Sequence, residues 1–312
     1  MINTMSNSLK IDDSWLFDPQ RLVEPSSWAG HTPFAAWLIA NIQPRRLVEL
    51  GTHTGFSYGS FCQTVQSRGL ATECYAVDTW QGDEHAGLYS DAIFEEVRAW
   101  HDAHYAGFSR LLRMTFDEAL GYFSDGSVDL LHIDGLHTYD AVKHDFDTWL
   151  PKLSSRGVVL LHDTNVRERG FGVWQLWETL SARYPHIGFD HSSGLGVLLV
   201  GDDVAPELVN LTRSYAQHPA LIRGIFAQLG GRIENFCDLR HERSQNQARG
   251  QALEEREAML QLRDAAIAEK DTALREQQEV QRQLHEQIER LMASRSWRLT
   301  TPLRALMGLL RR

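Results

Sequence analysis

Two acidic residues end apolar runs in the middle of the chain, and a histidine follows the first of them. HIDGLHTYD occupies 132–140 and LLHDT occupies 160–164, which puts Asp134 and Asp163 at strand ends and His137 three residues after Asp134. If the two strands are neighbours, the two carboxylates lie roughly 5 Å apart at one sheet edge. Carboxylates that close resist joint ionisation unless positive charge lies between them, and oxygen ligands suit Mg²⁺ or Mn²⁺. We therefore expect a divalent cation there, with His137 as the base for a substrate oxygen.

A simpler interpretation of the same residues needs no ligand. Asp134 would be a helix N-cap, His137 a surface residue and Asp163 a turn former. Two acids at strand ends with a histidine at this offset favour the chemical interpretation.

A glycine-containing turn lies upstream, in VELGTHTGFSYG at 48–59. Gly51 and Gly55 let the backbone approach a ligand at the carboxyl edge of the sheet, and Asp78, at the end of the next strand, can accept hydrogen bonds from the hydroxyls of a ribose. The spacing is G-x-x-x-G rather than the G-x-G-x-x-G of dinucleotide sites. Together the features indicate a nucleoside without a diphosphate.

This combination resembles the class I S-adenosylmethionine-dependent methyltransferases. The resemblance implies that one group of residues lines the methionyl part, that Asp78 holds the ribose, and that two residues after the third predicted strand hold the adenine. The methionyl group is Glu49, Gly51, Gly55 and Ser57, and the adenine pair is Thr115 and Phe116. For Glu49 and Ser57, helix capping and turn satisfaction remain the alternative.

The acidic segments narrow the resemblance to the metal-dependent branch that methylates sugar hydroxyls and includes cephalosporin-hydroxylase-type proteins. That branch has an Asp-x-x-His motif, matched by Asp134 and His137, and an acidic pair, of which Asp163 matches the second member. His162 stands where the family often has an acid. The implied metal ligands are therefore Asp134, His162 and Asp163. Because imidazole is a softer ligand, either the metal preference moves toward Mn²⁺ or another transition ion, or His162 is not a ligand.

The insert DTWQGDEHAGLYSD at 78–91 follows the second predicted strand and is rich in acids, histidine and aromatics. Inserts at an active edge commonly form substrate lids, so we expect sugar contacts here, although the two aromatics could instead pack the insert onto the sheet. The candidates are Trp80, Asp83, His85 and Tyr89. The segment 26–39 resembles the leading helix of the family and would bring His31 near the site.

These residues require a parallel sheet to position them. Apolar runs alternate with helical patterns, which predicts an α/β fold, and the resemblance, over about 28–201, implies a Rossmann-like, mostly parallel sheet whose last strand is antiparallel. The predicted strands are 46–51, 73–78, 110–114, 128–134, 157–163 and 194–201, and the predicted helices are 55–68, 138–150 and 170–184. The stripe Phe171, Trp174, Trp177 and Leu180 is expected to face the core.

The chain then changes character. We expect a methyltransferase domain over 1–205, a helical linker over 206–239, a coiled coil or long solvated helix over 240–293, and a basic amphipathic tail over 294–312. Leu253, Leu260, Ile267 and Leu274 recur every seven residues, and Leu284, Ile288 and Leu291 follow. A coiled coil would favour dimers or trimers, but Glu257, Asp264 and Asp271 at core positions leave a monomeric helix open.

The tail carries five arginines and no acid among leucines and Trp297. It can lie on an anionic membrane, dock on an acidic partner, or fold back on its own acidic domain. Its phrase SRSWRLT is similar to the ends of bacterial cell-surface polysaccharide proteins, which implies surface glycan assembly with a lipid-linked acceptor at the inner membrane face.

Bulk composition narrows the function further. The chain has 41 acidic and 31 basic side chains, which argues against nucleic acid as a partner. Its three cysteines lack a CxxC spacing, and no run of 18 apolar residues or leader-like start is found, so we expect a cytoplasmic protein.

We therefore expect an S-adenosylmethionine-dependent, metal-assisted O-methyltransferase acting on a sugar hydroxyl. The alternatives are a non-catalytic methyltransferase-like scaffold in a glycan-assembly complex and a nicotinamide-dependent sugar oxidoreductase, which shares the sheet but lacks the dinucleotide glycines.

Overall fold

The strand Arg46–Leu50 (β1) lies inside a seven-stranded sheet in the computed structural model, which describes residues 13–23, 27–83, 85 and 87–309. The strand order is β5-β2-β1-β6-β7-β9-β8. The first five of these strands are parallel, and β9 is antiparallel to both of its neighbours. The other bounds are β2 Glu73–Asp78, β5 Ser109–Arg113, β6 Val128–Ile133, β7 Leu153–His162, β8 His186–Phe189 and β9 Leu195–Leu199. The predicted fold class is confirmed, including the antiparallel last strand.

The strands form where apolar residues run without alternation. All of β6 and all of β9 are buried, because helices cover both faces of the sheet. All six predicted strands are present within a few residues, although β7 begins four residues earlier than predicted. The short strand β8 and a two-stranded hairpin, β3 Gly82–Asp83 with β4 Gly87–Leu88, were not predicted.

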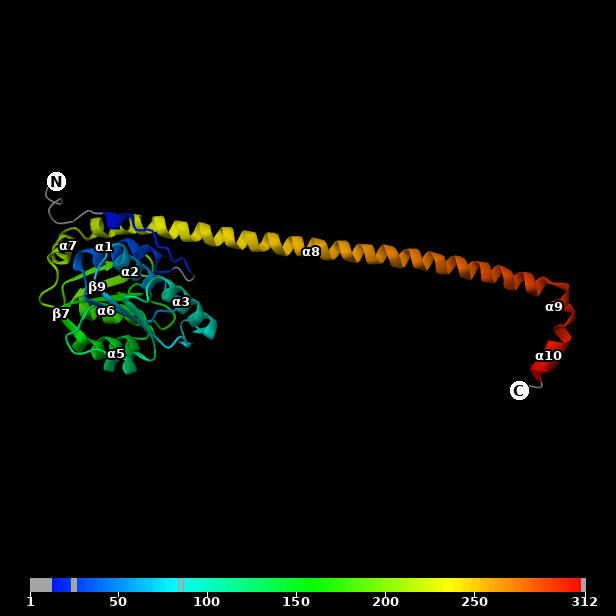
Figure 1. Ribbon diagram of the computed structural model, residues 1–312, viewed down its shortest axis with the longest axis horizontal. Helices are drawn as coiled ribbons and strands as arrows, with labels where there is room; N and C mark the ends of the chain where they lie inside the picture. The colour runs from blue at the N-terminus through cyan, green and yellow to red at the C-terminus, as the bar shows by residue number, and fades with distance from the viewer. Residues whose placement is uncertain (1–12, 24–26, 84, 86, 310–312) are drawn as a thin grey trace. The chain divides into compact units, whose positions relative to one another are not determined.

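Helices cover the sheet in two layers (Figure 1). The helices α1, α2, α7 and the first part of α8 pack on one face, and α4, α5 and α6 pack on the other. The bounds are α1 Thr32–Ile42, α2 Phe56–Ser67, α3 Asp91–His104, α4 Phe116–Ala119, α5 Tyr139–Trp149, α6 Val173–Ser181, α7 Pro206–Gln217 and α8 Pro219–Ala293. Short 3₁₀ segments occupy Asp13–Leu16, Ala29–His31, Leu120–Tyr122 and Leu150–Lys152.

The predicted core stripe around α6 is buried in part. Phe171 and Leu180 are buried and Trp177 packs half-buried against the core, whereas Trp174 does not belong to the core. The helix also buries Val173 and Leu176, which were not predicted. The α3 helix was not predicted. It buries Val97 and His101, and Ile93, Phe94 and Trp100 pack partly buried against the main core. These apolar residues recur at helical spacing, so the sequence did contain a periodic signal for this helix.

The first compact unit of the chain extends to Arg240. The segment 206–239, predicted as a helical linker, is helical and contributes to the main core through Leu208, Leu211, Ile222 and Phe226. Gly230 of α8 packs directly on the backbone of Gly30, since a Cβ at Gly230 would lie 2.1 Å from the Gly30 carbonyl oxygen. The start of α8 is thus part of the sheet domain.

The second unit covers His241–Arg312 and contains the rest of α8, α9 Arg295–Leu299 and α10 Thr301–Leu309. The large apolar side chains that the structure describes in this unit are exposed, and Arg304 lies over the Trp297 ring at 3.6 Å. Leu310, Arg311 and Arg312 of the predicted tail lie outside the described residues. Among the described residues, none of the helices has the length and apolar character required to span a bilayer.

Candidate active site

The carboxyl ends of the central strands form one row of functional residues. The register pairs Leu50 with both Val77 and Ile133, and pairs Ile133 with Leu161. The next residues along these strands are therefore Gly51, Asp78, Asp134 and His162, side by side at one edge. The chain reverses its direction of travel across the sheet between β1 and β6, and ligands of open α/β sheets bind at such a switch point.

Gly51 makes the close approach of two strand ends possible. It has φ +87°, and a Cβ there would lie 2.0 Å from the carbonyl oxygen of Asp134. Any other residue would push the β6 end away. Gly55, with φ +77°, is the N-cap of α2, and Ser57 is buried in the first turn of that helix. The predicted glycine turn therefore lies beside the predicted metal site.

Asp78 holds this turn in shape. One carboxylate oxygen accepts hydrogen bonds from the backbone N–H groups of Thr52 and His53 at 2.8 and 2.9 Å, and the other accepts from the N–H of Trp80 at 2.7 Å. The carboxylate is partly exposed and retains further lone pairs. Asp78 lies at the glycine turn, as expected; its role toward a ribose stays a prediction.

A buried hydrogen-bonded chain that the sequence analysis missed runs behind the turn. The indole N–H of Trp28 donates to Nε2 of His132 at 3.3 Å, and Nδ1 of His132 bonds to Oε2 of Glu49 at 2.9 Å. Because the indole can only donate, His132 carries its proton on Nδ1 and donates it to Glu49. Burial raises the pKa of Glu49, and the contact with His132 opposes that rise. These hydrogen bonds hold the Glu49 carboxylate in place at the end of β1.

Two buried oxygens at the glycine turn lack hydrogen-bond partners among the described residues. They are Oε1 of Glu49 and Oγ1 of Thr52. An unpaired buried acceptor costs on the order of 1–3 kcal/mol, so such atoms indicate a missing ligand. A carboxylate oxygen and a hydroxyl fit the ammonium group of an amino acid, which is the part of S-adenosylmethionine that the resemblance assigns to Glu49.

Asp134, His162 and Asp163 form a cluster with the composition of a metal site. One ligand atom from each lies within 4.8 Å of the others. Asp163 has φ +59°, a left-handed conformation that turns its side chain back toward β6. Two carboxylates and an imidazole fit Mg²⁺ less well than Mn²⁺ or another transition ion.

The surroundings of His162 fix the orientation of its ring. Nε2 bonds to the carbonyl oxygen of Ser192 at 3.1 Å, and Nδ1 points at Oδ1 of Asp134 at 3.2 Å. Metal-bound histidines typically donate their second ring N–H to a carbonyl, so this geometry suits coordination through Nδ1. Burial lowers the pKa of His162, but Asp134 and Asp163 outweigh it and raise the pKa to about 9.

His137 lies between the two carboxylates. Its Nε2 is 2.9 Å from Oδ2 of Asp163 and 3.4 Å from Oδ1 of Asp134. Burial lowers the pKa of His137, but the two carboxylates outweigh it and raise the pKa to about 10. For Asp134 burial raises the pKa, and the charge of His162 with bonds from both histidines holds it well below its usual range. The predicted convergence of Asp134, Asp163 and His137 is present in the structure.

Phe171 positions His137 from the other side. The two rings stack with centroids 4.4 Å apart and planes 6° apart, and the N–H of Gly172 donates to the carbonyl oxygen of His137 at 2.8 Å. His85 stacks on the same phenyl ring at 4.6 Å. Phe171 was expected in a core stripe, because an aromatic residue at helical spacing usually lies there. Its stacking on His137 could not be predicted, because no local sequence pattern indicates such a contact.

The insert places its aromatic residues differently from the prediction. Trp80 is 1% exposed, packs on Phe94 and donates its indole N–H to the carbonyl oxygen of His53. The prediction that Trp80 contacts a sugar is therefore wrong for this conformation, because its ring face is covered. Tyr89 is partly exposed and stacks on His53 at 4.4 Å. The side chain of Asp83 lies outside the described residues.

The adenine candidates lie at the end of β5. Thr115 is exposed and forms a capping box with Glu118 at the start of α4, a structural role that its sequence pattern also explains. The ring of Phe116 lies against Gly135, because a Cβ at Gly135 would be 2.5 Å from Cε2 of Phe116. Phe116 thus lies beside the strand end that carries Asp134.

His31 lies behind His162, near the site as expected. Its Nε2 bonds to the same Ser192 carbonyl oxygen at 3.0 Å, and its ring is 5.6 Å from that of His162. Burial lowers the pKa of His31 well below its usual value, and His162 lowers it further. The Ser192 hydroxyl in turn bonds to Glu234 of α8. Ser192 and Glu234 were not predicted from the sequence, because they come from a loop and a helix far along the chain.

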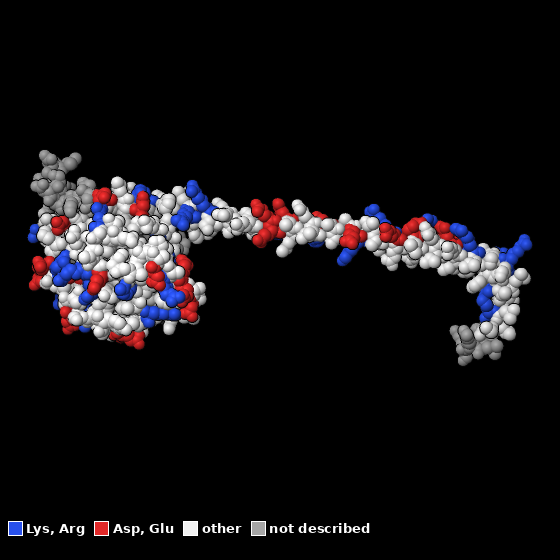
Figure 2. All heavy atoms as spheres, viewed as in Figure 1, with Lys and Arg blue, Asp and Glu red and all other residues white. Residues whose placement is uncertain are grey.

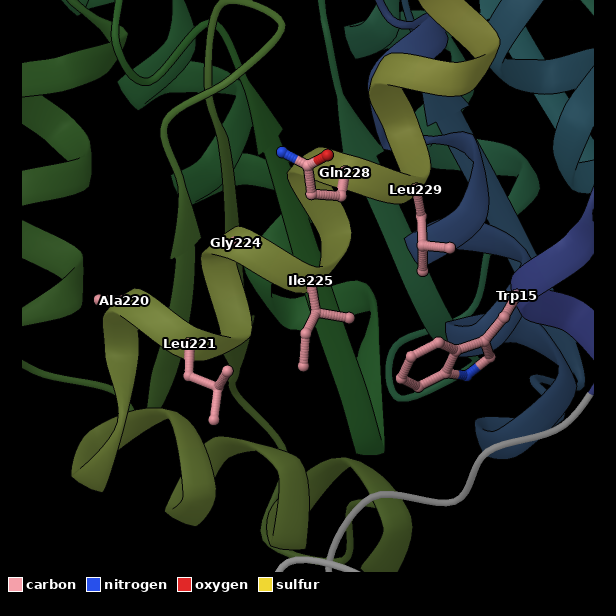
Figure 3. A pocket seen from close by; sticks show the side chains of 7 residues that line it. All are labelled: Trp15, Ala220, Leu221, Gly224, Ile225, Gln228 and Leu229. Carbon is pink, nitrogen blue, oxygen red and sulfur yellow. The ribbon is translucent and has the colours of Figure 1, made fainter. Parts of the chain in front are cut away.

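A hollow of 560 Å³ lies elsewhere on the first unit. Figure 3 shows the side chains that line it, which are mostly apolar and come from the 3₁₀ segment at 13–16 and the start of α8: Trp15, Ala220, Leu221, Gly224, Ile225, Gln228 and Leu229. None of these side chains carries an acid, a base or a metal ligand. The clustered acids and histidines are thus at the strand ends and not in this hollow.

Residues 48–164 match a protein-family model described as a methyltransferase domain. The matched segment contains most of β1 and all of β2 to β7, and it includes the glycine turn, Asp78, Asp134, His137 and Asp163. This part of the chain is therefore similar to a methyltransferase domain.

Particular proteins also resemble parts of the chain. The protein y4gI of Sinorhizobium fredii is 56% identical over 198 residues, which are 64% of this chain and 21% of y4gI. The chain thus spans about a fifth of the length of that relative. Among solved structures, an SAH-bound Podospora anserina methyltransferase is 15% identical over 63% of this chain and 92% of its own, with a TM-score of 0.42. TomG, an O-methyltransferase of Streptomyces achromogenes, is 16% identical over 64% and 95%, also with a TM-score of 0.42.

Proposed function

We propose that the chain transfers a methyl group from S-adenosylmethionine to a hydroxyl oxygen, with a divalent cation held by Asp134, His162 and Asp163. The observation that carries the proposal is the convergence of these three side chains, with His137 between the two acids, at the strand ends beside the glycine turn. The methyltransferase domain supplies the reaction class.

The donor site is assigned from the turn. S-adenosylmethionine supplies an electrophilic methyl group on its sulfonium. Glu49 Oε1 and Thr52 Oγ1, both buried without partners among the described residues, would accept from its ammonium group. Asp78 would accept from the ribose hydroxyls with its remaining lone pairs, and Phe116 offers a ring face to the adenine.

The acceptor needs to lose a proton, because an alcohol is a poor nucleophile. His137 is the residue placed to take that proton. While no other positive charge neutralises Asp134 and Asp163, however, a pKa of about 10 keeps His137 protonated at neutral pH. A divalent cation, when bound, supplies positive charge that makes an acceptor hydroxyl more acidic and offsets the two carboxylates. The base role of His137 and the cation site therefore depend on one another.

The acceptor is proposed to be a sugar hydroxyl in a bacterial surface glycan. His85 and Tyr89 on the insert would contact the sugar, and the buried Phe171 ring, which stacks on both His85 and His137, holds His85 next to His137. The resemblance of the Asp-x-x-His segment and of the basic tail supports this substrate class. Lipid-linked glycans at the cytoplasmic membrane face are the corresponding partners.

The experiment measures donor binding and turnover separately in the full-length chain. Calorimetry with S-adenosylmethionine should show binding that survives His137→Gln and weakens at least tenfold in Glu49→Gln. Transfer of labelled methyl to a panel of nucleotide sugars and glycans should fall by about 10²–10⁴ in His137→Gln. It should also be lost on chelation and return with Mn²⁺ or Mg²⁺.

A matched control is His144→Gln, because His144 is exposed on α5 and pairs with Asp117 away from the cluster. That variant should keep full turnover. Turnover that persists in chelator would remove the cation from the proposal. A chain that fails to bind S-adenosylmethionine would instead be a methyltransferase-like scaffold.

A further inference from the structure

The part of α8 beyond the sheet domain carries a long apolar stripe on its surface. Leucine or isoleucine occurs every seventh residue from 253 to 274 and again at 288, with Gln281 in the position between. We name this the apolar column: Leu253, Leu260, Ile267, Leu274 and Ile288. Each of these side chains is between 39% and 60% exposed. The column extends over about five heptads, more than the three or four that a coiled coil needs.

Charged residues flank the apolar column in two further columns of opposite sign. The basic column, three residues after each of the first three apolar positions, is Arg256, Arg263 and Lys270. The acidic column, four residues after the same positions, is Glu257, Asp264 and Asp271. Since each residue turns the helix by about 100°, the basic column lies about 60° to one side of the stripe and the acidic column about 40° to the other. Figure 2 shows both signs of charge along this helix.

The last two heptads keep the same register but replace the charges with leucine. Leu284 and Leu291 fall in the continuation of the basic column, and Ile288 falls in the apolar column between them. The apolar column is therefore heptad position a, the basic column position d and the acidic column position e. In this register Glu257, Asp264 and Asp271 flank the core, in contrast to the core positions expected for them above, and the basic column occupies the second core position. In the last heptad, Ile288 at a and Leu291 at d form the combination that favours two parallel strands.

We infer that this stripe binds the same stripe of a second copy of the chain, in parallel and in register. In a parallel pair related by a two-fold axis, the two flanks of a helix face opposite flanks of its partner. The acidic column of each copy then lies beside the basic column of the other, so the two-fold axis produces two equal rows of opposite charges. In an antiparallel pair like flanks meet, so acids would face acids and bases would face bases.

The intrachain ion pairs leave these columns available. Arg263 contacts Asp264 of its own chain at 3.4 Å, but the two side chains stay 66% and 70% exposed. Such exposed contacts between neighbours are weak and can exchange for contacts with a partner. The basic residues at position d disfavour pairing with an arbitrary apolar helix. They favour a partner helix that places acidic residues opposite them.

The test uses the full-length chain. Light scattering on a size-exclusion column should give twice the 35.5 kDa mass of the chain. Leu253→Cys and Ile288→Cys, made separately and oxidised mildly, should each give disulfide-linked dimers, since equal positions meet in a parallel register. The matched control is Ala265→Cys, on the opposite side of the helix, which should not link. The native Cys62, Cys74 and Cys237 are buried, so the unaltered chain should not link either.

Charge reversal tests the columns. The variant Arg256→Glu/Arg263→Glu/Lys270→Glu should weaken self-association at least tenfold. Adding Glu257→Arg/Asp264→Arg/Asp271→Lys should restore it, because the two columns are then exchanged. A monomeric chain at micromolar concentration or three times the monomer mass would overturn the inference. So would a link that forms only when the 253 and 288 cysteine variants are mixed, since that result requires antiparallel helices.

Discussion

The charge state of His137 and His162 is set by the two carboxylates between them. Cation binding through Nδ1 of His162 requires that nitrogen to lose its proton, and the free site holds pKa values of about 9 and about 10. A proton must therefore leave when a cation binds below pH 9. We expect the Mn²⁺ affinity measured by calorimetry to rise by up to tenfold per pH unit between pH 6.5 and 8.5. An affinity independent of pH would show that His162 is not a ligand.

The same two histidines affect the stability of the cation-free chain. Their folded-state pKa values are raised above the unfolded value of 6.5, so the stability they contribute is complete below pH 6.5 and is lost as pH rises toward 9 and 10. The loss is about 1.4 kcal/mol per pH unit for each proton concerned. Burial raises the pKa of Asp145 to about 7, so above pH 7 this residue contributes little to the change in unfolding free energy with pH.

Urea unfolding in chelator at pH 7.0, 7.75 and 8.5 measures this decline. His137→Gln should reduce the slope, and saturating Mn²⁺ should reverse it, because the cation replaces the protons. A slope that is the same in the wild type and in His137→Gln would contradict the assignment of these protons.

Several of these residues could be predicted from sequence and several could not. Asp134, His137 and Asp163 follow strands, so the fold class alone brings them to one edge. Trp80 was misassigned because an aromatic in an insert looks alike whether it packs or binds; here its φ of +51° and its indole bond to the His53 carbonyl turn the ring inward. His132 and Trp28 form a buried chain between elements about 100 residues apart, which no local pattern reports.

At the scale of elements, α8 reaches the site through the loop at 190–194. Glu234 bonds to the Ser192 hydroxyl, and the carbonyl of Ser192 accepts from His31 and His162. Because Ser192 and Ser193 have φ of +48° and +68°, this loop needs tertiary contacts to keep its shape. The helix therefore helps to orient His162, the proposed cation ligand, from a distance.

We expect Glu234→Ala to lower Mn²⁺ affinity by roughly tenfold, in the range seen for residues that orient metal ligands. Glu234→Gln should recover part of the loss, since an amide oxygen can still accept from the hydroxyl. Glu242→Gln, at an exposed position farther along α8, is the control and should leave affinity unchanged. Equal affinities for Glu234→Ala and the control would show that the loop keeps its shape without Glu234.

The elements themselves were mostly readable from apolar runs and turn residues. The strand β8 was missed because HIGF is short and begins with a histidine. The C-terminal boundary of the sheet domain could not be predicted. Residues 206–239 have a helical pattern whether they form a linker or part of the domain, and their burial against α1 and β8 depends on three-dimensional packing.

At the scale of the whole molecule, this packing decides where the chain can be shortened. Leu208, Leu211, Ile222, Phe226 and Ile233 are all buried in the main core. At about 1.5–3 kcal/mol each, they account for on the order of 10 kcal/mol, comparable with the stability of a whole domain. A chain ending at Arg240 should melt within a few degrees of the full-length protein in a thermal scan. A chain ending at 205 should show no cooperative transition, and a sharp one there would contradict this account.

The direct contact between Gly30 and Gly230 also bears on the order of events during synthesis. The segment that carries His31 lacks its contact with α8 until Gly230, 200 positions after Gly30, has been synthesised. At the usual rate of translation this takes about 10–40 s. Until then the apolar face of the early helix α1 stays without its cover. The nascent polypeptide thus completes its catalytic edge late, and chaperones have a long interval in which to hold it.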